Sequence, residues 1–463
     1  MIHQYKLNGY NIVLDTGSAS VHIVDDLAYD CIELFETNAQ SDIIARMLYK
    51  YKSSYINKQD IENVLDDIRS LKTGNKLWSK EPDYQKLAEK FKSKNKIKAL
   101  CLHIAHTCNL TCTYCFARGG TYRGEHELMS VDVGKQSIDF LVQNSGSRKN
   151  LEVDFFGGEP LMNITAVRQT VEYARQLEKI HNKKFRFTLT TNGILLDDDI
   201  INFLNAEMSN VVLSLDGRPF VHDRFRKTLN NKGSYDIVVP KFKELVKKRN
   251  GCNYYVRGTF THHNIDFSED IFHMADLGFK KLSMEPMVSG KQDPNALTDE
   301  DLPVLLEQYE LLAQEMLKRI GGSDEFEFYH YNIDLENGPC IYKRVTGCGA
   351  GSEYLAVTPA GDLYPCHQFV GETQFYMGDV WNGVTNSALR DEFKISGFDL
   401  NPKCKDCWAK LYCSGGCMAN AFHYSGSTHG VYDYGCELFR KRIECAIMLQ
   451  AAKSLSHTAG NSQ

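Results

Sequence analysis

The chain has 463 residues, 43% of them hydrophobic, and a formal net charge of −6. This length allows several domains with a large buried core, and the mild charge gives no general attraction to nucleic acid or anionic membranes. The first residues show no signal peptide, and no apolar run approaches the roughly 20 residues that span a bilayer. Fifteen cysteines in such a chain are more typical of metal binding in a reducing cytoplasm than of disulfides. We therefore predict a cytoplasmic protein with no nucleic-acid or membrane partner.

The first 72 residues predict three strands followed by three helices. The turn-forming pairs Asn8-Gly9 and Thr16-Gly17 separate alternating segments, as in a β-meander, and helical apolar spacing follows. The expected strands are 3–7, 10–15 and 18–24, and the expected helices are 27–35, 41–48 and 61–68. This order is typical of a small winged helix–turn–helix. However, 7 Lys and Arg against 11 Asp and Glu, net −4, do not suit a DNA backbone.

Residues 73–96 are Lys-rich and predict a linker, after which strands and helices alternate. Six strand–helix units imply parallel strands with right-handed crossovers, so we expect a partial (β/α)6 barrel over residues 97–298. The chemistry of such barrels lies at the carboxyl ends of the strands. A helix is expected over 299–320, in a bridging region that ends at 339. The six barrel strands are expected over residues 99–104, 151–156, 185–190, 211–215, 254–260 and 281–285.

Three cysteines, Cys108, Cys112 and Cys115, follow the first of these strands with the spacing C-x3-C-x2-C. Three thiolates can hold three irons of a [4Fe–4S] cube and leave the fourth iron open. This spacing, with Tyr114 before the last cysteine, resembles the signature of the radical S-adenosylmethionine (SAM) enzymes. The resemblance implies that SAM chelates the open iron and is cleaved to a 5′-deoxyadenosyl radical. The alternative is a zinc knuckle, although zinc sites prefer paired C-x2-C units.

The ends of later strands carry further motifs of the same family. Gly157-Gly158-Glu159-Pro160 follows the second strand, where glycines allow close approach of a ligand and a glutamate can accept from an ammonium group. The resemblance identifies it as the motif that holds the SAM amino group. Segments 257–259 and 285–287 are expected to line the pocket, and the turn at 190–193 is expected to shape it.

The resemblance also assigns the rest of the SAM site. Ser214 at the end of the fourth strand would meet the ribose, and Arg226, twelve residues later, would meet the carboxylate, for which an arginine fork is well suited. Arg224 is an alternative for that role. Tyr114 would lie near the adenine, and Asp216 is interpreted as a turn former.

A second set of cysteines, over residues 340–450, matches the SPASM pattern of peptide-modifying radical SAM enzymes. The resemblance implies two auxiliary clusters whose ligands interleave, so that one late cysteine returns to the earlier group. A pair of zinc sites is the alternative, because zinc ribbons also use C-x2-C pairs. The expected ligands are Cys348, Cys366 and Cys417 for auxiliary cluster I, and Cys404, Cys407, Cys413 and Cys436 for auxiliary cluster II.

The remaining cysteines are interpreted separately. Cys340 either completes auxiliary cluster I or leaves one of its irons open to a substrate thiolate. Four others lie in apolar stretches and are expected to be inert core thiols. These four are Cys31, Cys101, Cys252 and Cys445. Residues 451–463 are expected to form a flexible tail.

The resemblance covers nearly the whole chain and is strongest to maturases of SCIFF (six cysteines in forty-five) peptides. Residues 1–72 resemble the PqqD-like element that captures a leader peptide by strand addition, with a purely structural appendage or a DNA-binding unit as alternatives. The family implies thioether cross-linking of a ribosomal precursor peptide, three [4Fe–4S] clusters, SAM, and a reductant such as ferredoxin or flavodoxin.

Other functions remain open. An anaerobic sulfatase maturase would form formylglycine, but that family has an aspartate directly after the cysteine that matches Cys366, where this chain has His367. A carbon–carbon cross-linking enzyme is a further alternative. An iron–sulfur electron carrier without catalysis would not need the SAM motifs.

Overall fold

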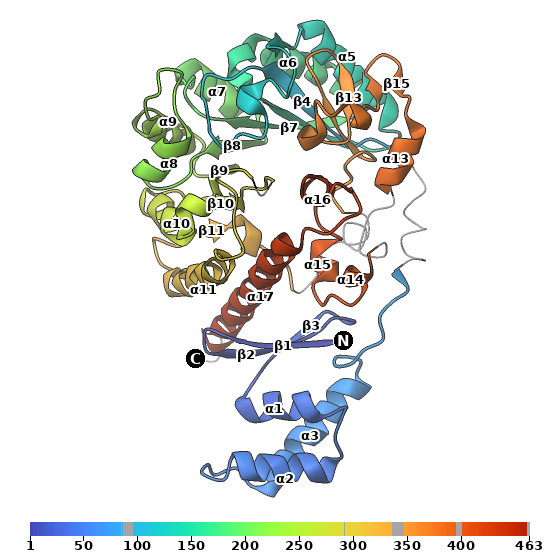
Figure 1. Cartoon of the computed structure of the whole chain (residues 1–463), viewed down its shortest axis with the longest axis vertical. Helices are drawn as coiled ribbons and strands as arrows, with labels where there is room; N and C mark the ends of the chain where they lie inside the picture. Colours follow the sequence, from blue (N-terminus) through green and yellow to red (C-terminus); the bar gives the residue numbers. More distant parts are fainter. Residues whose placement is uncertain (85, 87–95, 291, 336–346, 395–400, 461–463) are drawn as a thin grey trace.

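The computed structural model describes all residues except 85, 87–95, 291, 336–346, 395–400 and 461–463. A large α/β part, a C-terminal part that faces its open side, and a small N-terminal part follow one another along the long axis (Figure 1). Within the described ranges, no helix has the length and apolar character that a membrane span requires.

The N-terminal part has the predicted three strands followed by three helices. The strands form an antiparallel sheet in the order β1-β2-β3, and a separate apolar cluster that includes Val13, Leu27, Ile43 and Ile61 holds the helices to it. Asn57 caps the third helix in a capping box with Asp60, which fixes where that helix begins. The elements are β1 (Ile2–Leu7), β2 (Tyr10–Asp15), β3 (Ser20–Val24), α1 (Asp26–Leu34), α2 (Gln40–Lys50) and α3 (Lys58–Thr73).

All six predicted barrel strands are present, parallel and adjacent in the order of the sequence. They are β4 (Ala99–His106), β6 (Asn150–Gly157), β7 (Lys184–Thr191), β8 (Asn210–Ser214), β9 (Tyr254–Phe260) and β10 (Lys281–Pro286). The intervening helices are α5 (Val131–Asn144), α6 (Ile164–His181), α7 (Asp198–Glu207), α8 (Pro219–Phe225), α9 (Tyr235–Lys248) and α10 (Phe267–Asp276). Ser130 caps α5 by accepting a hydrogen bond from the backbone N–H of Val133.

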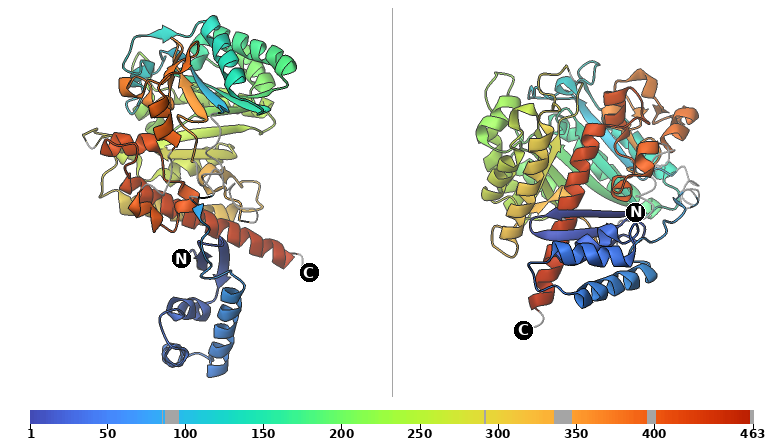
Figure 2. Two further views of the ribbon diagram at one scale, coloured as in Figure 1. Left: turned by 90° about the vertical axis from the view of Figure 1, so that its right-hand side faces the viewer. Right: turned by 60° about the horizontal axis from the view of Figure 1, so that its bottom comes forward.

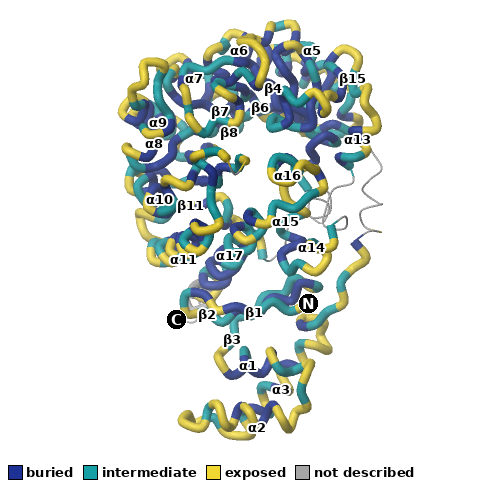
Figure 3. Tube along the Cα trace, in the orientation of Figure 1, coloured by how far each residue is buried: buried dark blue, intermediate teal, exposed yellow. Residues whose placement is uncertain are grey.

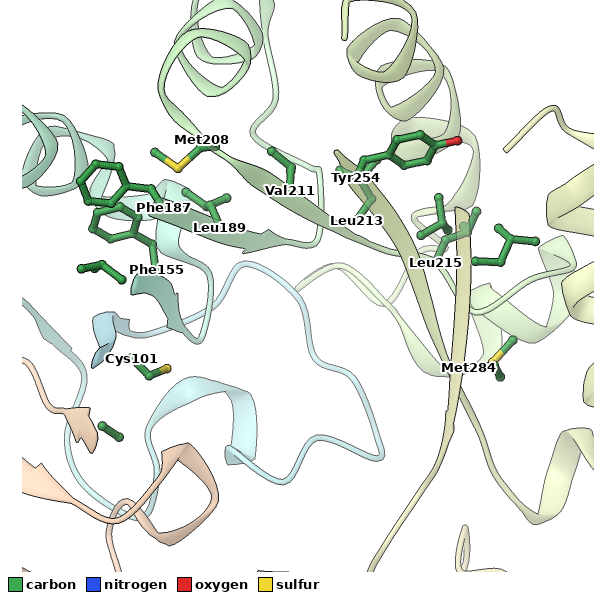
Figure 4. Packing of buried hydrophobic residues seen from close by; sticks show 14 of the residues in the cluster. Cys101, Phe155, Phe187, Leu189, Met208, Val211, Leu213, Leu215, Tyr254 and Met284 are labelled. Carbon is green, nitrogen blue, oxygen red and sulfur yellow. The ribbon is translucent and has the colours of Figure 1, made fainter. Parts of the chain in front are cut away.

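Alternation along the strands gives the sheet two different faces. Every second residue of β6 and β7 is buried, because successive side chains of a strand point to opposite faces. The buried set includes Phe155, Phe187, Leu213 and Tyr254, which lie side by side across neighbouring strands (Figure 4). The tube in Figure 3 shows the same pattern of buried strands beneath partly exposed helices. The opposite face is left for the cavity.

The sequence did not predict two short strands at the edges of the barrel. β11 (Glu327–Phe328) pairs in parallel with β10, and β12 (Tyr354–Val357) pairs in parallel with β4. β11 ends the sheet on one side, whereas β12 is followed by the antiparallel strand β13 (Asp362–Tyr364), and in the described part of the chain the two ends of the sheet do not pair with each other. The barrel is therefore open, and the C-terminal part lies at the opening.

The C-terminal part continues from β12 through short elements to one long helix. Helix α17 (Asp433–Gly460) packs along α11 (Leu302–Arg319), the helix predicted over 299–320. Residues 451–460, predicted as a flexible tail, are the end of α17, so that prediction was wrong for these residues. The other elements are β13 (Asp362–Tyr364), β14 (Gly378–Asp379), β15 (Gly383–Val384), α13 (Ser387–Lys394), α14 (Pro402–Lys405), α15 (Lys410–Cys413) and α16 (Met418–Ser425); β5 (Glu127–Leu128) pairs with β4.

Helix α17 also joins the N-terminal sheet to the rest of the molecule (Figure 2). The Tyr5 hydroxyl donates to the backbone carbonyl of Glu444 at 2.9 Å, and His3 Nε2 lies 3.0 Å from the Glu444 carboxylate. The His3 ring stacks on Trp408 with 3.9 Å between ring centroids. The N-terminal sheet is thus docked on elements of the C-terminal part.

Candidate functional site

A single cavity of about 1080 Å³ connects the barrel with the C-terminal part. It lies at the carboxyl ends of the strands, where the fold predicts the chemistry. Nine of the ten cysteines predicted to bind clusters line it, and Cys366 is the exception. All predicted SAM contacts line it as well: Tyr114, Gly157, Gly158, Glu159, Ser214 and Arg226. Arg224 does not line the cavity.

The first cysteine group lies on the loop after β4. Burial raises the pKa of Cys112 to about 12, Arg226 opposes this, and the nearby thiols of Cys115 and Cys108 add to it. Thiols with such raised pKa values are unreactive alone, and a metal centre would deprotonate them. The three side chains are therefore close neighbours in a setting that suits ligation.

The C-terminal cysteines separate into two further groups. Besides burial, the neighbours that raise the pKa of Cys366 are Cys417 and Cys348. The neighbours that raise the pKa of Cys413, after burial, are Cys436, Cys404 and Cys407. Cys417 is only four residues after Cys413, yet it lies with the earlier pair. This is the grouping that the interleaved ligand order implies, and the assignment of each thiol to a cluster stays a prediction.

Among the described residues, no three Cys, His, Asp or Glu side chains gather closely enough to hold a single metal ion.

Glu159 is a buried carboxylate held by three donors. Its Oε1 accepts from the backbone N–H of Leu161 at 3.1 Å and from the Thr191 hydroxyl at 2.8 Å, and its Oε2 accepts from the N–H of Asn192 at 2.7 Å. Burial raises the pKa of Glu159 to about 7 despite these donors. An ammonium group in the cavity would favour the ionised form, so the residue fits the predicted amino-group contact.

The two glycines before Glu159 have a role that the sequence did not show. A Cβ on Gly157, whose φ is +129°, would lie 2.4 Å from the carbonyl oxygen of Ala105, and one on Gly158 would lie 2.1 Å from that of Thr107. The glycines therefore bring this turn against the backbone that leads into the cysteine loop. The sequence predicts that these glycines allow the close approach of a ligand. In the structure they also allow the turn after β6 to lie against the backbone at the end of β4.

Asp216 is a central residue of the site rather than a turn former alone. Its buried carboxylate accepts two hydrogen bonds from Arg226, one from the Tyr114 hydroxyl at 2.5 Å and one from the N–H of Thr259 at 3.0 Å. The Arg226 guanidinium, which was predicted to meet a SAM carboxylate, thus donates to Asp216 through its Nε and Nη2. No signal in the sequence distinguished Asp216 from an ordinary turn aspartate.

Asn192 also joins the site. Its side-chain amide donates to Asn109 at 2.8 Å and lies 3.6 Å from the sulfur of Cys108. Hydrogen bonds to ligand sulfurs are among the factors that set the potential of an iron–sulfur cluster. The sequence placed this residue in a turn that shapes the pocket, and the contact with Cys108 is an addition.

The four cysteines that were predicted to be core thiols do not all lie in the core. Cys31, Cys101 and Cys445 are buried, as expected, but Cys252 is exposed. It follows the turn after α9, so the apolar stretch around it does not extend to its side chain. Cys340 lies outside the described residues.

Two family models match the chain. The Radical SAM superfamily model matches residues 102–271, and the SPASM model, an iron–sulfur cluster-binding domain, matches residues 348–408. The chain carries a radical SAM domain and a SPASM domain. Together these domains bind [4Fe–4S] clusters and SAM, which confirms the predicted cofactors and the predicted fold class.

Curated relatives are similar over most of the chain. One is a cysteine-type anaerobic sulfatase-maturating enzyme of Clostridium novyi (strain NT), 25% identical over 370 residues, which cover 76% of this chain and 96% of that relative. Another is the radical SAM cyclopropyl synthase TigE of Paramaledivibacter caminithermalis, 22% identical over 417 residues, which cover 84% of this chain and 83% of TigE.

Solved structures share the fold. The structure of anSMEcpe with bound AdoMet has a TM-score of 0.64 at 20% identity and covers 78% of this chain and 99% of its own. Streptococcus suis SuiB bound to S-adenosylmethionine has a TM-score of 0.53 at 16% identity and covers 93% of this chain and 97% of its own. The radical SAM barrel with a C-terminal SPASM domain is therefore the architecture of this chain.

Proposed function

We propose that this radical SAM enzyme acts on a ribosomally made, cysteine-rich precursor peptide of the SCIFF type and installs thioether cross-links. The observation that carries the proposal is the single cavity lined by the first cysteine group, the SAM-site residues and both C-terminal cysteine groups. A thioether forms when a carbon loses a hydrogen atom and a thiol loses a proton, and one further electron must leave. One enclosed space that holds both kinds of site suits this reaction.

The residues of the cavity would divide the work as follows. Cys108, Cys112 and Cys115 would hold the cluster that binds SAM, and Glu159 would accept from the SAM amino group. When bound, the clusters and SAM supply hydrogen-atom abstraction and take up the electron that bond formation releases. A ferredoxin or flavodoxin would provide the reducing electron.

Auxiliary cluster I would be held by Cys348, Cys366 and Cys417. With three protein thiols, that cluster would keep one position for the cysteine of the substrate, since metal coordination deprotonates a thiol. In the competing arrangement Cys340 is a fourth ligand of the cluster, and the variant Cys340→Ala would distinguish the two arrangements.

The N-terminal part would capture the leader of the precursor. Curated and structural relatives named for peptide or protein maturation support a peptide substrate, and SuiB has been solved with its precursor peptide SuiA. SuiB covers more of this chain than anSMEcpe does, by about the size of the N-terminal part. Because His3 and Tyr5 tie β1 to α17, we propose β3 as the edge that receives the leader strand.

Formylglycine formation is the second candidate, favoured by the sulfatase-maturating relatives. The residue after Cys366 argues against it. His367 is partly buried, with a pKa that burial and then Arg257 lower to about 4, and it replaces the aspartate that the sulfatase maturases carry there.

The test is an anaerobic reaction of the reconstituted enzyme with SAM, a reductant and a cysteine-rich precursor encoded beside the gene. A thioether product loses two hydrogen atoms per link and one titratable thiol, whereas formylglycine loses sulfur and gains oxygen. The triple variant Cys108→Ala, Cys112→Ala, Cys115→Ala should form neither product nor 5′-deoxyadenosine. Cys252→Ala, which changes an exposed thiol outside the cavity, is the matched control and should behave as wild type. Sulfur loss from the peptide would favour the second candidate.

A further inference from the structure

Arg257 is a cavity-lining arginine with no polar partner among the residues that the structure describes. It lies on β9, where its neighbours Val256 and Gly258 are buried while Arg257 is exposed to the cavity. Its register partners are Ser214 on β8 and Ser283 on β10. Over the described ranges of the chain, Arg257 donates no hydrogen bond and forms no ion pair.

Among the described residues, the charges around Arg257 leave one positive charge in excess. The Glu285 carboxylate lies 3.5 Å from Arg442 Nη1 and 3.4 Å from His330 Nε2. Although burial raises it, these two residues and Arg257 hold the pKa of Glu285 below its usual value. Burial lowers the pKa of His330 to about 4, so its ring is neutral near pH 7. Two guanidinium groups therefore face one carboxylate, and Arg442 is the one paired with it.

The position of Arg257 places a charged fork between the two halves of the proposed reaction site. Toward the barrel, it is level with Ser214, the proposed ribose contact. Toward the C-terminal part, the positive charge of Arg257 helps to lower the pKa of His367, which follows Cys366. A group bound by Arg257 would therefore lie between the SAM site and auxiliary cluster I. A planar fork of donors selects a carboxylate, to which it can give two parallel hydrogen bonds.

We propose that Arg257 binds a side-chain carboxylate of the substrate peptide, from an aspartate or glutamate close to the residue that reacts. The inference rests on the proposed function and adds to it a preference for acidic residues in the modified segment. Water can solvate the guanidinium while the cavity is open. Once a peptide displaces that water, an unpaired charge is costly, so peptides without a carboxylate at this position are disfavoured.

Two other roles for Arg257 lead to different results. If Arg257 pairs with the SAM carboxylate, its loss would weaken SAM binding without any peptide. If it balances the charge of the cluster thiolates, its loss would shift a cluster potential and leave peptide preference unchanged.

The experiment compares two capped six-residue peptides that each contain one cysteine and differ in one residue, aspartate or asparagine. Binding is measured anaerobically by calorimetry on the full-length, iron-loaded enzyme saturated with SAM. We expect wild type to bind the aspartate peptide about tenfold more tightly, which corresponds to about 1.4 kcal/mol, because asparagine cannot form the charge-assisted hydrogen bonds. Arg257→Gln should lose this preference by weakening the aspartate peptide alone, and Arg257→Lys should keep part of it.

Arg186→Gln is the matched control. Arg186 is an exposed arginine on β7, which β8 separates from β9, and it does not line the cavity, so the variant should keep the full preference. The affinity for SAM should be unchanged in all variants. The role of Arg257 would be overturned if wild type bound the two peptides equally or bound neither. It would also be overturned if Arg257→Gln bound SAM more weakly, or if that variant kept the peptide preference and showed a shifted cluster potential. Cross-linking of the precursor by the same wild-type preparation would show that the proposed function survives such a result.

Discussion

Arg226 holds the carboxylate of Asp216 through two nitrogens, with Nε 2.9 Å from Oδ2 and Nη2 3.2 Å from Oδ1. The same carboxylate receives the Tyr114 hydroxyl. One buried aspartate on the loop after β8 thus orients two residues that the sequence assigns to SAM, and the Arg226 guanidinium lies over the Tyr114 ring, 5.5 Å from its centroid. The aspartate acts as a positioning residue, because it does not itself line the cavity.

The first prediction concerns this aspartate. Asp216→Asn should destabilise the protein by about 3–5 kcal/mol, because it leaves the buried guanidinium of Arg226 without its counter-charge, and it should weaken SAM binding as well. Chemical denaturation and SAM titration measure the two effects. The matched control is Asp270→Asn, which breaks another buried aspartate–arginine pair, with Arg218 at 2.8 Å, outside the cavity. It should lower stability while SAM binds normally to the folded protein; equal loss of SAM affinity in both variants would contradict the positioning role.

The second prediction is a pH dependence from Glu159. Its pKa rises from 4.5 to about 7 on folding, so the folded state favours the protonated form. The stabilising contribution is complete below the unfolded pKa and is lost as pH rises through about 7. SAM binding should show the opposite trend and tighten as pH rises through that range, since its ammonium group needs the carboxylate ionised. Unfolding experiments and SAM titrations at several pH values check both trends.

In Glu159→Gln both trends should flatten. The variant should also bind SAM about tenfold to a hundredfold more weakly near pH 8, because it loses a charge-assisted hydrogen bond. A wild-type SAM affinity that is constant over the range would argue against this contact.

The third prediction concerns Cys417. The Cys417 thiol lies with Cys348 and Cys366. We therefore expect Cys348→Ala to lose about four irons per chain, and the double variant Cys348→Ala, Cys417→Ala to lose no more than that. Adding Cys417→Ala to Cys413→Ala should remove about eight. Iron analysis and electron paramagnetic resonance of the four variants decide this. The reverse pattern would assign Cys417 to the other cluster.

The fourth prediction concerns the docking of the N-terminal sheet. His3→Ala removes the contact with Glu444 and the stacking on Trp408, and should lower the free energy of unfolding by about 1–2 kcal/mol. Iron content and SAM binding should stay as in wild type. Lys6→Ala, on the same strand, removes an exposed ion pair with Asp26 and the contact of the ammonium group with the Tyr29 ring, and should change stability by less than about 1 kcal/mol.

A point variant is preferable here to deletion of residues 1–72. Tyr5, Leu7, Ile12 and Leu14 belong to the main apolar core, so the deletion would expose core surface on the remaining chain. Weak peptide binding after such a deletion would mix lost leader capture with lost stability.

The sequence predicted those parts of the site that depend on spacing. Cysteine intervals and the Gly-Gly-Glu turn are local patterns, and the six parallel strands follow from periodicity. Asp216 and Arg257 were not recognised as polar centres, because their meaning depends on which residues the fold brings to them. The fork of Arg226 was assigned to a ligand, while the structure gives two of its nitrogens to Asp216. The strands β11 and β12 are too short to show a period of their own.

Helix α17 carries Cys436 in its first turn and Glu444 two turns later. A rise of about 1.5 Å per residue places the backbone that meets Tyr5 roughly 12 Å from the cysteine proposed for auxiliary cluster II. Order at one of these points favours order at the other, because a helix propagates cooperatively. Iron insertion and docking of the N-terminal sheet on α17 then favour each other to the same extent. A chain whose N-terminal sheet is loose would load iron less readily, and a chain without iron would hold that sheet, the proposed site of leader capture, less firmly.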